Sequence, residues 1–251
     1  MNKKFFIWEG VYSSFSEIPK IGKGYSSKVW LEKSFDRIKK TKMVNYRESL
    51  LPFLVAIVWS IKRTKKIRVL DYGGNLGRGY VLTSQALVNN SKYLDYHIIE
   101  LKKLCQLGRK IYQKKENVFF HEILPAKFGR IDVVYFCSSL QYIENWKGLL
   151  EKLAGLKPKY FLFDDLPAGD IPTFATVQNY YGSKIPYWFF NIGEIIELLE
   201  LLGYKLIFKS SFVATILGRE QDLPQHNFLL KYRLGKSCSL LFTKDETTNK
   251  S

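Results

Sequence analysis

The stretch Ile67-Arg68-Val69-Leu70-Asp71-Tyr72-Gly73-Gly74-Asn75-Leu76-Gly77 decides the fold of this chain. A short apolar run ends in the carboxylate of Asp71 and breaks at once into glycines, which predicts a buried strand, a tight loop and then a helix. Such loops usually cradle a phosphate with backbone N–H groups at a helix N-terminus. A carboxylate at the strand tip repels a pyrophosphate but suits a ligand with a cationic head. The stretch therefore favours a cationic ligand over a dinucleotide.

Apolar runs and amphipathic segments alternate along the rest of the chain. Strands are expected at 67–72, 93–100, 117–120, 131–137, 160–163, 204–214, 227–232 and 238–242, and helices at 41–62, 78–88, 102–113, 146–156 and 193–202. This alternation predicts an α/β fold with a doubly wound, mostly parallel sheet. The closing strands are not separated by a helix, which predicts an antiparallel edge. Ligands of such sheets bind at the carboxyl ends of the strands.

The pattern divides the chain into unequal parts. Residues 1–64 are expected to form an irregular leader and a helix packed on the core, and residues 65–243 the α/β domain. Residues 244–251 are polar and are expected to form a flexible tail. The segment 165–192 is rich in Pro, Gly and aromatic residues and is too long for a plain connection, which predicts a lid inserted after the fifth strand.

Composition indicates a basic protein in a reducing compartment. The chain has 251 residues and a formal net charge of +16, which favours anionic partners such as phosphorylated substrates, nucleic acid or an anionic membrane surface. The basic residues are scattered and no nucleic-acid-binding motif accompanies them, so nucleic acid is not the expected partner. A genome of low GC content, which favours lysine codons, explains the charge equally well. Three cysteines without C-x-x-C spacing and the lack of a long apolar run favour the cytoplasm, with peripheral membrane contact left open.

The opening stretch resembles motif I of the Rossmann-like S-adenosylmethionine-dependent methyltransferases, acid-x-Gly-x-Gly-x-Gly. Asp71, Gly73 and Gly77 occupy fixed positions of that motif, and Asn75 replaces its middle glycine. Asparagine tolerates positive φ better than other non-glycine residues, so the turn is expected to survive. The resemblance implies S-adenosylmethionine as cofactor, bound by a set of loop residues: Asp71, Gly73, Gly74, Asn75 and Gly77.

Two later strand ends complete the resemblance. Glu100 closes the second strand, where an acid can hold both hydroxyls of a ribose, and Leu101 would lie near the adenine. The run Ser138-Ser139-Leu140-Gln141 follows the fourth strand, and the resemblance places it against the methionine end of the cofactor. No cluster of residues has the spacing of metal ligands, so no metal is expected.

The whole chain is also similar to a family of uncharacterised bacterial proteins assigned as methyltransferases and found among surface-polysaccharide genes. The similarity is carried by Gly10-Val11-Tyr12, Gly24-Tyr25, Leu70 to Gly74 with Leu76-Gly77, Ser138 to Ile143, Thr176-Val177-Gln178 and Pro186-Tyr187-Trp188-Phe189-Phe190. It implies O-methylation of a sugar or glycan intermediate, which could be lipid- or phosphate-linked. Gln178, Tyr187 and Trp188 in the lid would bind this acceptor. The oligomeric state does not follow from the sequence.

Methylation of a hydroxyl is helped by a general base. Asp164 and Asp165 follow the fifth strand and are the first candidates, and His226 is the next. Two alternatives stay open. One is a non-catalytic cofactor- or glycan-binding module of the same fold, which the replacement at Asn75 favours. The other is an RNA methyltransferase, which the net charge favours.

Overall fold

The centre of the molecule is a seven-stranded sheet with the strand order β10-β13-β6-β5-β2-β3-β4. The computed structural model describes residues 5–19, 21–22, 24–41, 49–62, 66–125, 128–213, 215–216 and 218–245. The strands are β2 (Ile67–Tyr72), β3 (Leu94–Ile99), β4 (Val118–His121), β5 (Val133–Cys137), β6 (Tyr160–Leu166), β10 (Tyr204–Phe212) and β13 (Ser237–Lys244). Strands β4, β3, β2, β5 and β6 are mutually parallel.

The antiparallel edge predicted from the sequence is present. Strand β13 runs antiparallel to both β6 and β10, so β10 has the same direction as the parallel strands. The prediction of an α/β fold with a mostly parallel sheet and an antiparallel edge is therefore confirmed.

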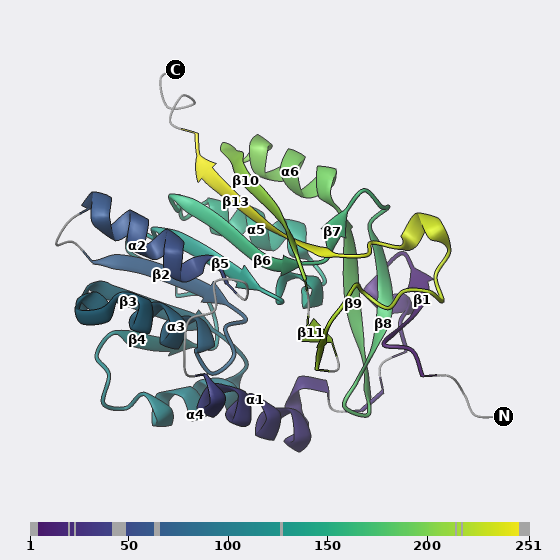
Figure 1. Ribbon diagram of the computed structural model, residues 1–251, viewed down its shortest axis with the longest axis horizontal. Coiled ribbons are helices and arrows are strands. Elements are labelled where there is room, and N and C mark those ends of the chain that lie inside the picture. The colour runs from purple at the N-terminus through teal and green to yellow at the C-terminus, as the bar shows by residue number, and fades with distance from the viewer. Residues whose placement is uncertain are drawn as a thin grey trace.

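Helices cover both faces of this sheet (Figure 1). One face packs against α2 (Leu51–Lys62), α3 (Arg78–Ala86) and α4 (Lys102–Ile111) around one apolar cluster. The other face packs against α5 (Trp146–Ala154) and α6 (Ile192–Leu201) around a second cluster. Successive strand residues such as Val69 and Leu70 belong to different clusters, because side chains alternate between the faces of a strand.

A second sheet stands beyond one end of the central strands (Figure 1). Its order is β1-β8-β9-β7, formed by β1 (Trp8–Tyr12), β7 (Ala168–Gly169), β8 (Phe174–Tyr180) and β9 (Ser183–Asn191). Most of the segment predicted as a lid is thus a β-hairpin, and β1 of the leader pairs with it antiparallel. The leader is also more regular than expected, because α1 (Lys28–Lys40) follows β1 and begins with Ser27 as its cap.

The prediction of a strand at 227–232 is wrong. These residues form turns and the short 3₁₀ helix Leu230–Tyr232. Phe228 is buried, whereas Leu229 and Leu230 are exposed, and the N–H of Phe228 bonds locally to the carbonyl of Gln225. Local turn bonds replace strand pairing here. Of the helix expected at 41–62, residues 42–48 lie outside the described residues, as do residues 246–251 of the expected tail.

The remaining elements are short. They are the 3₁₀ helices Phe15–Glu17, Gly24–Ser26, Val88–Tyr93 and Leu140–Tyr142, and the two-residue strands β11 (Thr215–Ile216) and β12 (Arg219–Glu220). None of the helices in the described ranges has the length and apolar character needed to cross a bilayer.

Candidate functional site

Asp71 lies at the carboxyl end of β2 with its side chain almost entirely buried. The hydroxyl of Tyr96 donates a 2.7 Å hydrogen bond to its Oδ2, while Oδ1 is buried and has no hydrogen-bond partner among the described residues. Burial is the main cause that raises the pKa of Asp71 to about 7; the hydrogen bond from Tyr96 opposes this rise, and the nearby Glu100 carboxyl adds to it. An unpartnered buried carboxylate oxygen at a strand end is typical of a ligand site.

The glycine-rich loop packs directly on this carboxylate. Gly73 and Gly77 have φ of +74° and +81°, and Asn75 has φ of +52°, as its tolerance of positive φ predicted. A Cβ on Gly74 would lie 2.4 Å from Oδ2 of Asp71, and one on Gly73 would lie 2.6 Å from Cβ of Ser139. The loop therefore needs glycine both for its backbone conformation and for its close approach to neighbouring strand ends.

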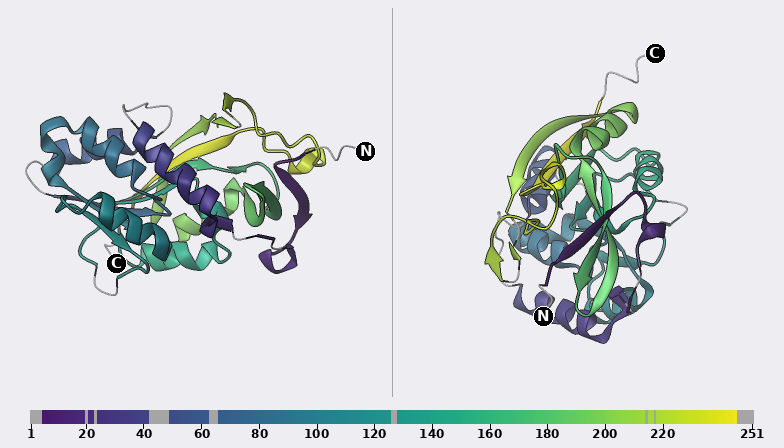
Figure 2. Two further views of the ribbon diagram at one scale, coloured as in Figure 1. Left: turned by 90° about the horizontal axis from the view of Figure 1, so that it is seen from below. Right: turned by 90° about the vertical axis from the view of Figure 1, so that its right-hand side faces the viewer.

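Helix α1 of the leader covers the loop and lies beside α4 (Figures 1 and 2). The side-chain amide of Asn75 donates a 3.1 Å hydrogen bond to Oγ of Ser34 on α1. Trp30 of α1 packs with Leu76 of the loop and Leu104 of α4. The leader is thus part of the site, which the expectation of an irregular segment did not anticipate.

Glu100 follows β3, the strand next to β2, and its side chain is partly buried. Burial raises its pKa to about 7, while the backbone N–H groups of Leu101 and Asn75 lower it. Its Oε2 accepts a hydrogen bond from the Leu101 N–H, and the Leu101 side chain is half exposed. The structure therefore brings the two predicted cofactor acids, Asp71 and Glu100, to adjacent strand ends on either side of the loop.

The turn after β5 lies against the same loop. Oγ of Ser139 donates a 2.6 Å hydrogen bond to the carbonyl of Tyr72, which ties this turn to the end of β2. Ser138 has φ of +50° and donates a hydrogen bond to Oδ2 of Asp165. Leu140 and Gln141 are buried, and Oε1 of Gln141 has no hydrogen-bond partner within the described residues. The four residues predicted to enclose the cofactor, 138–141, thus lie in the turn after β5. Oε1 of Gln141 is the second unpartnered oxygen at this edge, after Oδ1 of Asp71.

The two adjacent acids near the carboxyl end of β6 face different surroundings. Asp164 accepts hydrogen bonds from the Leu50 N–H at 2.9 Å, Tyr135 Oη at 3.1 Å and Ser239 Oγ at 2.8 Å. These donors occupy both of its oxygens, so Asp164 ties the start of α2 and strand β13 to β6. Asp165 instead lies beside Ser138, which is in the turn after β5, and burial raises the pKa of Asp165. Of the two candidate bases, Asp165 is the one placed toward the predicted site.

Tyrosines from the leader, from this turn and from the hairpin form a group here. Tyr142 donates a 3.0 Å hydrogen bond to Oε1 of Gln178 on β8. The ring of Tyr142 also packs edge-on against Tyr187 of β9 and Tyr25 of the leader, at 5.2 and 5.1 Å between centroids. Burial raises the pKa of Tyr187 well above its ordinary value, and Asp165 raises it further. The sequence did not identify Tyr25 and Tyr142 as site residues, although both lie in segments that carry the resemblance, Gly24-Tyr25 and Ser138 to Ile143.

Two predicted residues are not brought to this group. Trp188 neighbours Tyr187 on β9 and points to the opposite face, where it stacks on Phe15 at 4.9 Å. His226 is exposed and lies beside Phe6, with a ring distance of 5.4 Å. The geometry thus places Trp188 in the core and His226 on a surface loop rather than beside Asp165.

The residues present fit a cofactor with a cationic end and a ribose. Asp71 offers an unpartnered buried oxygen, Glu100 offers a carboxylate at the next strand end, and the glycines let the loop pack directly on Asp71 and Ser139. Three non-glycine residues with positive φ, namely Asn75, Ser138 and Asp165, lie at this edge. Such backbone conformations concentrate at functional sites.

Comparisons with known proteins show the fold. No family model matches the chain, and no curated protein matches it. The structure is similar to 1,6-didemethyltoxoflavin-N1-methyltransferase of Burkholderia thailandensis, solved with S-adenosylhomocysteine, with a TM-score of 0.55 and 14% identity over 86% of this chain and 84% of that one. It is similar to magnesium protoporphyrin IX methyltransferase of Synechocystis, solved with S-adenosylmethionine, with a TM-score of 0.53 and 14% identity over 88% and 93%.

A third similar structure is an S-adenosylmethionine-dependent methyltransferase of Clostridium acetobutylicum, with a TM-score of 0.50 and 10% identity over 85% of this chain and 97% of that one. These matches span most of both chains at low identity. The chain therefore has the Rossmann-like fold of S-adenosylmethionine-dependent methyltransferases.

Proposed function

We propose that this chain is an S-adenosylmethionine-dependent methyltransferase. The observation that carries the proposal is the buried, unpartnered Oδ1 of Asp71 beneath a glycine-rich loop, with Glu100 at the next strand end. A cationic ligand stabilises the ionised form of such a carboxylate, whose pKa burial has raised. Similar folds that were solved with S-adenosylmethionine or S-adenosylhomocysteine support the same cofactor.

The chain's own residues divide the work of binding and proton transfer. Asp71 and the loop would hold the cationic methionine end, Glu100 would hold the ribose hydroxyls, and Leu101 would lie along the adenine. Ser138, Ser139, Leu140 and Gln141 would enclose the reacting end. When bound, S-adenosylmethionine supplies a methyl group activated by a sulfonium.

Asp165 would accept the proton of the acceptor hydroxyl. Burial raises its pKa, which suits a base near neutral pH, and Ser138 orients its carboxylate through a hydrogen bond. Correct orientation of the two reactants contributes much of the rate in a displacement of this kind.

The acceptor we propose is a hydroxyl of a sugar or glycan intermediate in surface-polysaccharide synthesis. The side-chain amide of Gln178 and the hydroxyls of Tyr142 and Tyr187 lie near the turn after β5. These polar groups can form hydrogen bonds with sugar hydroxyls. Aromatic rings beside them suit the apolar face of a sugar. The proposal includes a cytoplasmic location and peripheral contact with an anionic membrane, where lipid-linked acceptors reside.

Isothermal titration with S-adenosylmethionine and S-adenosylhomocysteine tests the cofactor. Asp71→Ala and Glu100→Ala should each weaken binding at least about tenfold, because each removes a charged hydrogen-bond partner. Glu151→Ala on the exposed side of α5 is the control and should bind normally. Absence of binding at millimolar ligand would contradict the proposal. Transfer of a labelled methyl group to cell-envelope intermediates then tests the acceptor.

A non-catalytic module of the same fold is the second candidate. The side chain of Asn75 occupies a position where a glycine was expected, and it bonds to Ser34 of α1 rather than leaving the loop open. This candidate predicts cofactor binding without transfer to any acceptor. Single-turnover assays with saturating cofactor and acceptor mixtures separate the two functions.

A further inference from the structure

Helix α2 is apolar on both its buried and its exposed sides. Its buried side packs on the central sheet through a set of residues that are all nearly inaccessible: Leu51, Pro52, Leu54, Val55 and Val58. On its outer side Phe53, Ile57 and Ile61 remain 68%, 41% and 66% exposed. Their spacing of four residues aligns them along one side of the helix, and we call them the apolar stripe. A helix that is apolar all round normally has a cover on every side.

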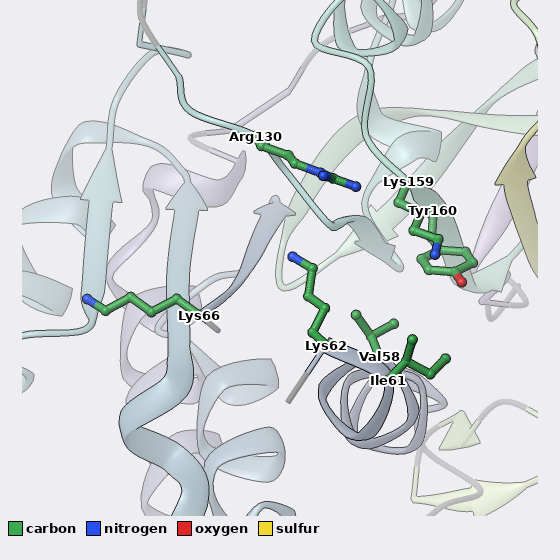
Figure 3. Close-up of a pocket in the computed structure, with 7 residues that line it drawn as sticks. All are labelled: Val58, Ile61, Lys62, Lys66, Arg130, Lys159 and Tyr160. Carbon is green, nitrogen blue, oxygen red and sulfur yellow. The ribbon is translucent and has the colours of Figure 1, made fainter. Parts of the chain in front are cut away.

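A basic hollow lies at the C-terminal end of the same helix (Figure 3). It has a volume of about 450 Å³ and is lined by Val58, Ile61, Lys62, Lys66, Arg130, Lys159 and Tyr160. Four of these lining residues are cationic and none is acidic. In Figure 3 the side chains of Lys62 and Arg130 extend into the space above Val58 and Ile61. The hollow thus combines an apolar floor with a cationic rim, and Ile61 belongs to both it and the apolar stripe.

One of these cations is already paired. Lys62 forms an ion pair with the buried Asp132 at the start of the sheet. The side chain of Lys159 lies over the ring of Tyr160, 5.4 Å from its centroid, and this contact leaves the positive charge uncompensated. An anion in the hollow would therefore meet a net positive charge.

Aromatic residues flank the same helix. The rings of Trp59 on α2 and Tyr93 lie 6.0 Å apart, and Lys92 lies 5.2 Å from the centroid of the Tyr93 ring. Tryptophan, tyrosine and lysine together are typical of surfaces at the boundary between water and lipid. The apolar stripe, the basic hollow and this aromatic pair surround a single helix.

We propose that the outer side of α2 docks on an anionic membrane surface, with the apolar stripe entering the boundary of the acyl chains and the basic hollow receiving a lipid phosphate. Apolar insertion combined with attraction of cations to anionic lipids is how peripheral proteins bind membranes. The net charge of +16 complements such a surface. A nucleic acid would fit less well, because two of the three residues of the apolar stripe are isoleucines, which have no aromatic face on which bases stack.

Docking on this side orients the carboxyl edge of the sheet. The N–H of Leu50, just before α2, bonds to Asp164 at the carboxyl end of β6, while Lys62 at the other end pairs with Asp132 at the amino end of β5. Helix α2 therefore runs alongside the strands from one end to the other. With α2 in the membrane plane, the site at the carboxyl edge lies at the level of the head groups. This inference names the surface for the membrane contact in the proposed function, and its observations do not depend on cofactor binding.

Vesicle co-sedimentation of the full chain tests the proposal. Vesicles of phosphatidylcholine with 30% phosphatidylglycerol should bind the protein, and vesicles of pure phosphatidylcholine should bind it much less. Arg130→Gln with Lys159→Gln should weaken the partition about 30-fold, from about 1 kcal/mol per cation. The triple variant Phe53→Asn, Ile57→Asn and Ile61→Asn should weaken it at least about tenfold.

Matched controls change equally exposed groups elsewhere. They are Lys152→Gln with Lys231→Gln, and the triple variant Leu201→Asn, Leu229→Asn and Leu230→Asn, all at exposed positions. These variants should retain membrane binding. Equal binding by all variants, no preference for anionic vesicles, or a dimer in solution that only the α2 variants dissociate would overturn the proposal. Titration with S-adenosylmethionine on the same proteins reports the cofactor site separately.

Discussion

Two carboxyl groups at the carboxyl edge of the sheet, of which Asp71 is fully and Glu100 partly buried, have pKa values raised toward neutrality. Burial raises the pKa of Asp71 and of Glu100 to about 7, above the ordinary values near 4. The folded chain therefore keeps protons that the unfolded chain releases between about pH 4 and pH 7. The contribution of these groups to the free energy of unfolding falls as the pH rises through that range and levels off above it. Ionisation of these two carboxyl groups near neutral pH thus lowers the free energy of unfolding, while it provides the charged form that binds a cationic ligand.

Cofactor affinity should consequently depend on pH. A cationic ligand favours ionised Asp71, so binding below pH 7 releases a proton and tightens as the pH rises, by at most about tenfold per unit for each group. Above about pH 7 the affinity should become constant. Isothermal titration in buffers of different ionisation enthalpy measures the proton release directly. Asp71→Asn should bind weakly and lose part of this dependence, and a pH-independent affinity in the unaltered protein would contradict the expectation.

The neighbouring acids Asp164 and Asp165 should respond differently to the same isosteric change. Asp165→Asn should lower methyl transfer by about 10²- to 10⁴-fold with little effect on cofactor affinity, because it removes a proton acceptor and keeps the shape. Asparagine also tolerates the φ of +49° at this position. Rates at saturating cofactor and the dissociation constant are the two measurements.

Asp164→Asn is the comparison for that experiment. Its carboxylate accepts three hydrogen bonds, and an amide must present its NH₂ group to at least one donor. The expected cost is about 1–3 kcal/mol of unfolding free energy, measured by denaturant titration. Full activity in Asp165→Asn together with inactivity in a folded Asp164→Asn would reverse the assignment.

At the scale of elements, local patterns predicted the central sheet well. The apolar run before Asp71 and the glycines after it specify a strand, a loop and a helix without reference to distant residues, and Asn75 adopts the predicted positive φ. Strand pairing over long distances was not predictable in this way. Strand β1 pairs with β8, and Glu9 lies opposite Val177. Nothing in the leader alone indicates that partner.

The acceptor residues show a second limit. Side chains alternate along a strand, so Tyr187 and Trp188 could not both face one site once β9 was recognised as a strand. The prediction of a lid loop at 165–192 implies no such alternation, because loop side chains have no fixed period. The isolated His226 carried no pattern at all, and only its position in the fold shows that it is exposed.

The glycine-rich loop gives a prediction at this scale. Gly73→Ala should abolish measurable cofactor binding and destabilise the protein by about 1–3 kcal/mol, because a Cβ at φ +74° would lie 2.6 Å from Ser139. Gly182→Ala is a matched control, since Gly182 also has φ of +74° but no atom lies within 4 Å of its added Cβ. Titration and thermal unfolding compare the two. Equal cofactor binding by both variants would show that the contact with Ser139 is unimportant.

At the scale of the whole molecule, the two sheets share the main apolar core, and the second sheet also has a smaller core of its own. One face of the β8–β9 hairpin joins the main cluster through residues such as Val177 and Phe190. Its other face forms a smaller cluster with Trp8 of β1 and Phe228 of the C-terminal loop. Segments from the beginning, middle and end of the chain thus meet around the hairpin, as the right-hand view of Figure 2 shows. Tyr187 of the hairpin depends on this smaller cluster for its position.

Trp8→Ala should loosen the second sheet before the central one. Trp8 is 4% exposed and packs on Tyr187 and Phe189 at 5.6 and 5.4 Å, and removing a buried tryptophan side chain costs about 3–5 kcal/mol. Hydrogen exchange should accelerate across residues 174–191 and remain slow across 67–72, with cofactor affinity retained and methyl transfer lost. Trp146→Ala on α5 is the control, because it opens the main cluster and should accelerate exchange in both sheets. Uniform acceleration of exchange by Trp8→Ala would mean that the two sheets unfold as one unit. The group formed by Tyr25, Tyr142 and Tyr187 could not then open independently of the cofactor site.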